Sequence, residues 1–236
     1  MRSLSFWNDK QPVIVMVKAV IFDWDGTLAD TKSAVVRSFQ KVLTEAGCLV
    51  SDEFIERRIG IGTKKTIIEA FRECHMRLAV SMLEKLAKEK VRIQAELADI
   101  VNLLGGATEL LEELHGRIKI ALATMSSQKV VDKLLSEKKI GGYFDVVVTA
   151  DEVVKPKPDP EVFLVSATRL GVNPEDCIVV EDSVFGVRAA KAAEMKCIAV
   201  SSGAYSREEL WEENPDLLIN SLAEKDRILN FIFSSV

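Results

Sequence analysis

The chain has 236 residues, of which 48% are hydrophobic and 28% are charged. This length fits one domain with a smaller insertion, and the hydrophobic content excludes a disordered or collagen-like protein. Acidic side chains outnumber basic ones by 36 to 31, so the formal net charge is −5. Because no basic excess is available to displace counterions from a phosphate backbone, we expect no nucleic-acid partner.

No hydrophobic run approaches the roughly 18 residues that a membrane span requires. The first dozen residues mix charged and apolar side chains and do not resemble a secretory signal. We therefore expect a soluble, cytoplasmic protein with no membrane partner, either a monomer or a homodimer. The two histidines, His75 and His115, lie in helical patterns and leave little for zinc or Ser-His-Asp chemistry. Any enzymatic chemistry must rest on carboxylates, lysines and hydroxyls.

Short apolar runs alternate with amphipathic helical patterns along most of the chain. We expect strands at residues 17–22, 118–123, 144–148, 177–180 and 197–200, with a sixth at 217–220. Apolar strands separated by helices predict a Rossmann-like α/β fold, in which a parallel sheet is covered on both faces. Residues 1–15 fit an extra edge strand, an interface or a disordered extension, and the sequence does not choose among these.

The stretch between the first two strands has helical periodicity and no convincing strand. Apolar stripes at helical spacing occur at positions 35, 36, 39, 42 and 43, then at 67, 71, 74 and 78, then at 86, 93, 97, 100 and 104. We predict a bundle-like helical cap domain over residues 31–105, inserted after the first strand. The α/β core would comprise residues 1–30 and 106–236, with Gly105 and Gly106 as the return hinge.

The segment Asp-Trp-Asp-Gly-Thr-Leu at residues 23–28 follows the first predicted strand. Carboxylates at Asp23 and Asp25 are two positions apart and point to the same side as the strand ends, and Gly26 permits a tight turn. A calcium loop is excluded, because its first and twelfth positions would be an isoleucine and a lysine. An ordinary Asp-Gly turn stays open from this segment alone.

Three further strands end in polar residues. Thr124 ends the second strand, the run Lys-Pro-Lys-Pro-Asp-Pro at 155–160 follows the third, and Glu181 and Asp182 end the fourth. Taken singly, the proline-rich run fits a stiff connector and the acidic pair fits a helix cap. Together they bring carboxylates, a hydroxyl and a lysine to the carboxyl edge of one parallel sheet, where open α/β sheets bind ligands.

These motifs, in this order, resemble those of the haloacid dehalogenase superfamily of phosphotransferases. The matching patterns are D-x-D-G-T-L, a strand-end threonine, K-P-x-P-D and E-D-S-x-x-G, and the resemblance extends from residue 17 to about residue 231. The helical insertion resembles the cap of phosphoglycolate phosphatases and β-phosphoglucomutases. The resemblance implies that Asp23 is the nucleophile, giving an aspartyl-phosphate, and that Asp25 is the general acid and base.

The same resemblance implies a magnesium site and a set of phosphoryl contacts. Mg²⁺ would be bound by Asp23, the Asp25 backbone carbonyl, Asp182 and Glu181, which offer the hard oxygens that the ion prefers. Lys155 would neutralise the phosphoryl oxygens and Thr124 would donate a hydrogen bond to them, with Met125 and Ser126 beside it. Lys157 is expected to be solvated. This assignment predicts that Lys155→Ala abolishes turnover and that Lys157→Ala leaves it largely intact.

Substrate specificity is expected to come from the cap. A loop between cap helices contains Gly60 and Lys64, which would reach the core site when the cap closes over the substrate. A helix N-terminus followed by solvated lysines explains the same loop equally well.

The expected activity is hydrolysis of a small phosphorylated metabolite such as phosphoglycolate or a sugar phosphate. Asp25 points to phosphoester chemistry, since the dehalogenases of the superfamily lack this second aspartate. Related sugar-phosphate mutases carry a histidine where this chain has Val35, which favours hydrolysis. A β-phosphoglucomutase-like phosphoryl transferase and a non-catalytic phosphometabolite-binding relative remain the alternatives.

Overall fold

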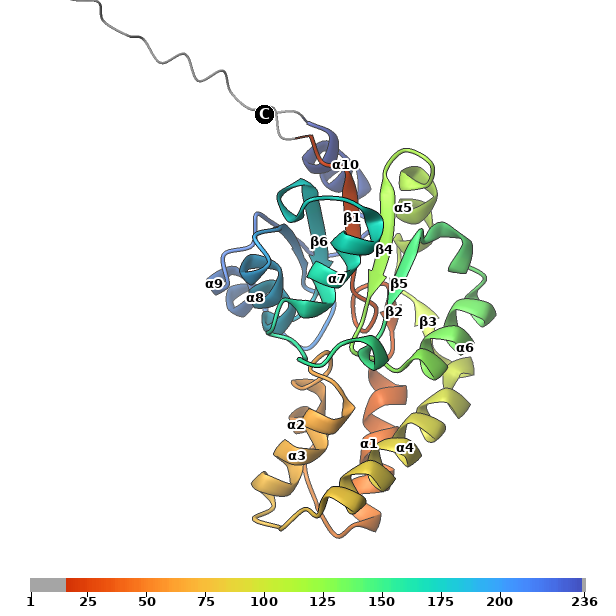
Figure 1. Cartoon of the computed structure of the whole chain (residues 1–236), viewed down its shortest axis with the longest axis vertical. Coiled ribbons are helices and arrows are strands. Elements are labelled where there is room, and N and C mark those ends of the chain that lie inside the picture. Colours follow the sequence, from red (N-terminus) through yellow and green to blue (C-terminus); the bar gives the residue numbers. More distant parts are fainter. Residues whose placement is uncertain (1–15, 235–236) are drawn as a thin grey trace, which may run out of the picture.

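The computed structural model describes residues 16–234. Its centre is a parallel sheet with the strand order β5-β4-β1-β6-β7-β8 (Figure 1). The strands are β1 Ala19–Phe22, β4 Lys119–Ala123, β5 Val146–Val148, β6 Cys177–Glu181, β7 Lys196–Val200 and β8 Leu217–Ile219. The chain builds outward from β1 to β4 and β5, then crosses back to β6. This reversal creates a crevice at the carboxyl end of β1, the usual ligand site of such a sheet.

Helices cover both faces of the sheet, as the unbroken apolar strands predicted. Val20 and Phe22 face one hydrophobic cluster, whereas Ala19 and Ile21 face another. The first face is covered by α5 Ala107–Leu114, α6 Gln128–Lys138 and α10 Lys225–Phe233. The second is covered by α7 Glu161–Leu170, α8 Val184–Ala192 and α9 Arg207–Glu212. The predicted fold class is confirmed.

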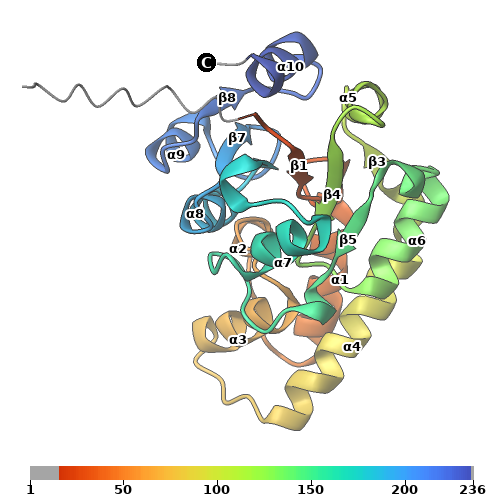
Figure 2. The same cartoon turned by 45° about the horizontal axis from the view of Figure 1, so that its top comes forward.

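Four helices beyond the carboxyl ends of the strands share a separate hydrophobic cluster (Figures 1 and 2). They are α1 Lys32–Glu45, α2 Asp52–Glu56, α3 Thr63–Glu73 and α4 Val80–Glu96. The first predicted stripe is buried in this cluster. The third stripe was predicted to run on to Leu104, but α4 ends at Glu96 and Ile100 is exposed. The apolar residues keep their helical spacing beyond the end of α4, but a 3-10 turn at Ala98–Ile100 interrupts the α-helical geometry there.

Two short strands join these helices to the sheet. β2 Ala29–Asp30 and β3 Asn102–Leu103 pair in antiparallel fashion where the chain leaves the core and returns to it. The prediction of no strand after residue 31 is therefore wrong at this point, because two-residue strands are too short to show a period. The domain boundaries at 30/31 and 105/106 stay a prediction.

The remaining elements are single turns of 3-10 helix. They lie at Ala98–Ile100, Gly141–Tyr143, Ala150–Glu152 and Pro174–Asp176. Among residues 16–234, no helix is both long and apolar enough to cross a membrane. The three alternatives for residues 1–15 lie outside the described residues.

Candidate active site

The predicted carboxylates converge at the carboxyl end of β1. Asp23 directly follows β1, Glu181 is the last residue of β6, and Asp182 comes next. Because β6 lies beside β1 in the sheet, these side chains meet: one carboxylate oxygen from each of the three lies within 4.8 Å of the others. All three side chains are buried. The structure therefore brings together the carboxylates that the motifs predicted.

The lysine that reaches this cluster is Lys157. Its Nζ lies 2.6 Å from Asp23 Oδ1 and 2.5 Å from Glu181 Oε1, and its side chain is fully buried. The side chain of Lys155 is 70% exposed, with its Nζ 3.6 Å from the Asp159 carboxylate. The prediction that Lys155 enters the site and that Lys157 is solvated is therefore wrong.

Electrostatics explains this exchange of roles. Burying an ammonium group is less costly where carboxylates compensate its charge, and Asp23 and Glu181 provide that compensation for Lys157. The sequence permits either lysine, because the run Lys-Pro-Asp-Pro-Glu at 157–161 has the same alternation of proline as the frame that starts at Lys155. The two overlapping frames cannot be told apart without the backbone path of the loop.

The cluster has an excess of negative charge. Burial raises the pKa of Asp23 in spite of the attraction of Lys157, and the charge of Glu181 raises it further. Burial and the neighbouring charges of Glu181 and Asp23 also raise the pKa of Asp182 well above its usual range. Burial alone would lower the pKa of Lys157, but its two carboxylate partners outweigh this effect and raise it. A single ammonium group thus faces several buried carboxylates, an arrangement that fits a further cation.

The cluster's donor atoms fit a hard divalent ion such as Mg²⁺, but they are not equally free. Glu181 Oε1 accepts from Lys157, and Oε2 accepts from Ser183 Oγ and from the backbone N–H groups of Asp182 and Ser183, each at 3.0 Å. Asp182 accepts a single hydrogen bond, from Thr27 Oγ1 at 3.2 Å, among the described residues. Asp23 and Asp182 therefore have the most free lone pairs for an ion, whereas Glu181 mainly holds Lys157 in place.

Three glycines give these carboxylates room, and a Cβ on one of them, Gly203, would lie 1.8 Å from Asp182 Oδ2. A Cβ on Gly26, which has φ +84°, would lie 2.3 Å from Asp182 Oδ2, and a Cβ on Gly186 would lie 1.8 Å from the Glu181 carboxyl carbon. All three distances are too short for a real side chain, so each carboxylate occupies the space that a side chain would need. Gly186 stands inside α8 and is the glycine of the E-D-S-x-x-G pattern found in the sequence.

Asp25 is held by hydroxyl groups at the end of β4. Its Oδ2 accepts from Ser126 Oγ at 2.8 Å and from Thr124 Oγ1 at 3.4 Å, and the Ser126 N–H donates to Thr124 Oγ1 at 3.0 Å. Asp25 Oδ1 is buried and has no hydrogen-bond partner among the described residues. The carboxylate is thus fixed through one oxygen while the other is free for a substrate. Met125 is buried and, together with Asp25, lines a small cavity between the cap and the core.

The cap contributes a buried lysine that sequence reasoning missed. Lys90 of α4 lines the cavity above Asp25; its Nζ lies 2.5 Å from Gln94 Oε1 and 4.4 Å from the centre of the Phe39 ring. Burial lowers the pKa of Lys90 to about 8, against the opposing attraction of Asp25. Its position four residues after Leu86, on the apolar face of the helix, was the available signal.

The two cap residues that the sequence suggested are placed differently. Gly60 lines the cavity between cap and core. Lys64 is exposed and forms an ion pair with Glu84 at 2.7 Å, outside that cavity. The cavity itself has a volume of only about 20 Å³, which is room for about one water molecule. This is therefore a closed arrangement of cap and core.

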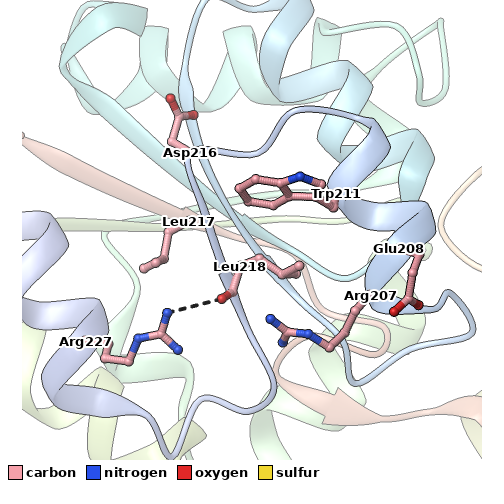
Figure 3. A pocket seen from close by; sticks show the side chains of 7 residues that line it. All are labelled: Arg207, Glu208, Trp211, Asp216, Leu217, Leu218 and Arg227. Carbon is pink, nitrogen blue, oxygen red and sulfur yellow. Dashed lines mark hydrogen bonds between the residues drawn. The ribbon is translucent and has the colours of Figure 1, made fainter.

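A separate hollow lies beside β8, at the edge of the sheet (Figure 3). Arg207 and Arg227 point into it from α9 and α10, with Trp211 beside them, and Arg227 donates to the Leu218 carbonyl at 3.5 Å. No residue of the four motifs lines this hollow. It is not part of the site described above.

Comparison with known proteins agrees with this geometry. The family model for haloacid dehalogenase-like hydrolases matches residues 20–200, which include all four motifs. The chain belongs to this family. The resemblance drawn from the motifs is thereby confirmed, and so is the expected enzyme class, a haloacid dehalogenase-type phosphoric monoester hydrolase.

Similar members of the family include sugar phosphatases and a mutase. The fructose-1-phosphate phosphatase YqaB of Escherichia coli is 34% identical over 77% of this chain and 95% of its own length. A phosphorylated carbohydrates phosphatase of Thermotoga maritima is 34% identical over 75% of this chain and 82% of its own length. The crystal structure of a β-phosphoglucomutase from Clostridium difficile matches with a TM-score of 0.81 at 26% identity, covering 92% of this chain and 99% of that one.

Proposed function

We propose that this member of the family is a Mg²⁺-dependent phosphatase that hydrolyses small sugar phosphates through an aspartyl-phosphate on Asp23. The observation that carries the proposal is the pairing of two differently held aspartates. Asp23 lies against a buried cation, Lys157, while Asp25 lines the cavity under the cap and keeps Oδ1 without a hydrogen-bond partner among residues 16–234. One carboxylate is suited to attack phosphorus and the other to move a proton.

Asp23 acts as the nucleophile in the first step. A carboxylate oxygen of Asp23 forms a bond to phosphorus as the bond from phosphorus to the leaving oxygen breaks, in line with the attack. Lys157, which lies 2.6 Å from Asp23 Oδ1, offsets the negative charge of the phosphoryl oxygens. Asp23, Asp182 and the Asp25 backbone carbonyl would hold Mg²⁺, which would supply the further positive charge that a dianion needs to approach a carboxylate.

Asp25 handles the protons of both steps. Its free Oδ1 gives a proton to the departing alcohol oxygen, and the resulting carboxylate then takes a proton from the water that hydrolyses the aspartyl-phosphate. Ser126 and Thr124 hold Oδ2, so the carboxyl group keeps one orientation through both transfers. Thr124 and Ser126 are therefore positioning residues for Asp25.

The cap selects the substrate and excludes water. Lys90 and Arg58 line the cavity opposite Asp25, where a sugar's hydroxyl groups or a second anionic group would lie. A cavity of about 20 Å³ cannot admit a sugar phosphate, so the cap has to open for binding and release. The sugar phosphatases among the relatives support this class of substrate.

A mutase is the second candidate, and the similarity to a β-phosphoglucomutase favours it. Val35 argues against it. This side chain is buried and lines the cavity next to Asp25, where it offers no group that can exchange a proton. Water, rather than a second sugar hydroxyl, is then the expected acceptor of the phosphoryl group.

The test is phosphate release from a panel of sugar phosphates, phosphoglycolate, nucleotides and p-nitrophenyl phosphate, with and without Mg²⁺. We expect Mg²⁺-dependent release by the wild type and none by Asp23→Asn, with a hexose or pentose phosphate ranking first. Conversion of glucose 1-phosphate to glucose 6-phosphate without phosphate release would establish the mutase instead. A wild type that neither releases phosphate nor becomes phosphorylated would be a binding protein.

A further inference from the structure

A second and larger cleft lies between the cap and the core. Its volume is about 910 Å³, and its walls come from α3 and α4 on one side and from the segments after β4 and β5 on the other. Six basic side chains line it, namely Lys64, Lys65, Lys85, Lys88, Arg92 and Lys129. The acidic side chains that line it are Glu84, Glu89 and Asp151. The cleft is therefore positive in a chain whose net charge is −5.

Three of the lysines that line the cleft are not paired with a carboxylate of the described residues. Glu84 is paired with Lys64, and Glu89 is paired with Arg92. Lys85, Lys88 and Lys129 are exposed and have no carboxylate within ion-pair distance in the described part of the chain. Because they form no ion pair within residues 16–234, they contribute a positive potential at the mouth of the cleft.

The cleft reaches the cavity above Asp25. Gly62, Thr63 and Met125 line both spaces and form the partition between them. The Met125 methyl carbon lies 3.5 Å from the position that a Cβ on Gly62 would take. Methionine is unbranched and flexible, so a small opening of the cap joins the two spaces without rebuilding the core.

The opposite side of the site has the reverse charge. Besides the site's own Asp25 and Asp182, the cavity there is lined by Asp30 and Glu56, with Lys32 as its basic residue. Lys32 lies 3.7 Å from Glu56 and is largely offset by it. Asp30 and Glu56 outnumber Lys32, so this side offers a phosphate dianion a less positive potential than the basic cleft does.

We propose that the basic cleft is the entrance for phosphate monoester dianions, and that Lys85, Lys88 and Lys129 steer them toward Asp23. The inference rests on the proposed function and adds to it an entry route for the substrate and the lysines that attract the substrate to that route. Charges on an open surface act over a Debye length of about 10 Å at 0.1 M salt, so the effect belongs to substrate capture at low ionic strength and not to the chemical step.

The test is a triple variant, Lys85→Gln, Lys88→Gln and Lys129→Gln, assayed from about 10 mM to about 0.5 M salt. At low salt we expect kcat/KM to fall about tenfold and kcat to stay the same. In the triple variant, log kcat/KM should decline less steeply with ionic strength than in the wild type. At high salt the kcat/KM values of the two proteins should converge. The matched control is Arg37→Gln, Arg72→Gln and Arg77→Gln, which removes three exposed charges that do not line the cleft.

Two results overturn the steering proposal while the proposed function stands. One is a triple variant whose kcat/KM follows the wild type at every salt concentration, and the other is an equal loss in the control variant. A wild type that releases no phosphate from any ester contradicts the proposed function itself. The two failures are therefore distinguishable in the same experiment.

Discussion

Lys157 is buried among carboxylates, while Lys155, two positions earlier, lies in solvent. We expect Lys157→Ala to lower kcat for phosphate release by at least about 100-fold, because it removes the protein's own cation from the phosphoryl site. Lys155→Ala should leave kcat unchanged. Steady-state kinetics with Mg²⁺ measures both, with near-ultraviolet circular dichroism as the check on folding. Loss of activity in Lys155→Ala alone would contradict the structural assignment.

Asp25 is expected to act both in phosphoryl transfer to Asp23 and in hydrolysis of the aspartyl-phosphate. The variant Asp25→Asn allows these two steps to be observed separately. p-Nitrophenolate leaves without a proton, so this variant should still transfer the phosphoryl group to Asp23 from p-nitrophenyl phosphate. Water activation is lost, so we expect a burst of p-nitrophenolate equal to the enzyme concentration, followed by slow turnover. Stopped-flow absorbance measures the burst. Asp23→Asn, which lacks the nucleophile, should give none, and a burst there would refute the assignment.

Lys90 should make stability depend on pH. Its pKa is about 8 in the folded protein, against 10.5 for an ordinary lysine. Between these values the unfolded chain binds a proton that the folded protein does not, so folding becomes more favourable as the pH rises. Relative to Lys90→Met, the free energy of unfolding of the wild type should rise by about 3 kcal/mol from pH 8 to pH 10.5. Urea unfolding at several pH values measures this difference in the free energy of unfolding. A difference that stays constant or falls as the pH rises would contradict the lowered pKa of Lys90.

At the scale of elements, α8 contains a glycine where helix propensity favours alanine. Alanine in a helix is normally more stable than glycine by about 1 kcal/mol. At Gly186 the Cβ would lie 1.8 Å from the Glu181 carboxyl carbon, so we expect Gly186→Ala to destabilise the fold by at least about 2 kcal/mol. Gly142→Ala, with nothing within 4 Å of its Cβ, is the matched control. Equal unfolding midpoints for the two variants would contradict the close approach of Glu181.

The strands and the first cap helix could be predicted because their apolar patterns are long and regular. β1 is buried on both faces, and the stripe from Val35 to Leu43 in α1 packs as its spacing indicated. The end of α4 and the pair β2–β3 could not be predicted, since a 3-10 turn continues the helical spacing and two residues show no period. The core motifs converged because the carboxyl ends of neighbouring parallel strands must meet.

What the sequence could not supply was the direction of individual side chains. Lys155 and Lys157 occupy equivalent places in overlapping frames, and only the path of the loop decides which one is buried. Lys90 is a charged residue at a position of α4 where the helical spacing calls for an apolar one. A single lysine on such a face is easily interpreted as solvent-exposed, so its burial was not predicted from the sequence. Both residues became recognisable from their burial and their partners.

For the whole molecule, the proposed hydrolysis requires the closed cap to open during each turnover. The contacts across the junction include an ion pair from Arg57 to Glu209 at 2.6 Å and a hydrogen bond from the Tyr205 hydroxyl to the Arg57 carbonyl at 2.5 Å. Lys65 Nζ also donates to the Lys157 carbonyl at 3.4 Å. The Arg57 and Glu209 side chains are both more than one-third exposed, so the pair is worth less than about 1 kcal/mol. Such contacts favour closure over a bound substrate without preventing its release.

In the proposed mechanism, Asp23 becomes phosphorylated during hydrolysis. The most direct measurement is acid quenching of the wild type during turnover of a sugar phosphate with Mg²⁺, followed by mass spectrometry of the peptide that contains residues 19–30. We predict a single phosphoryl group on Asp23, present during turnover and absent after substrate is exhausted. Turnover without phosphorylation of Asp23, or with the phosphoryl group on another residue, would contradict the account.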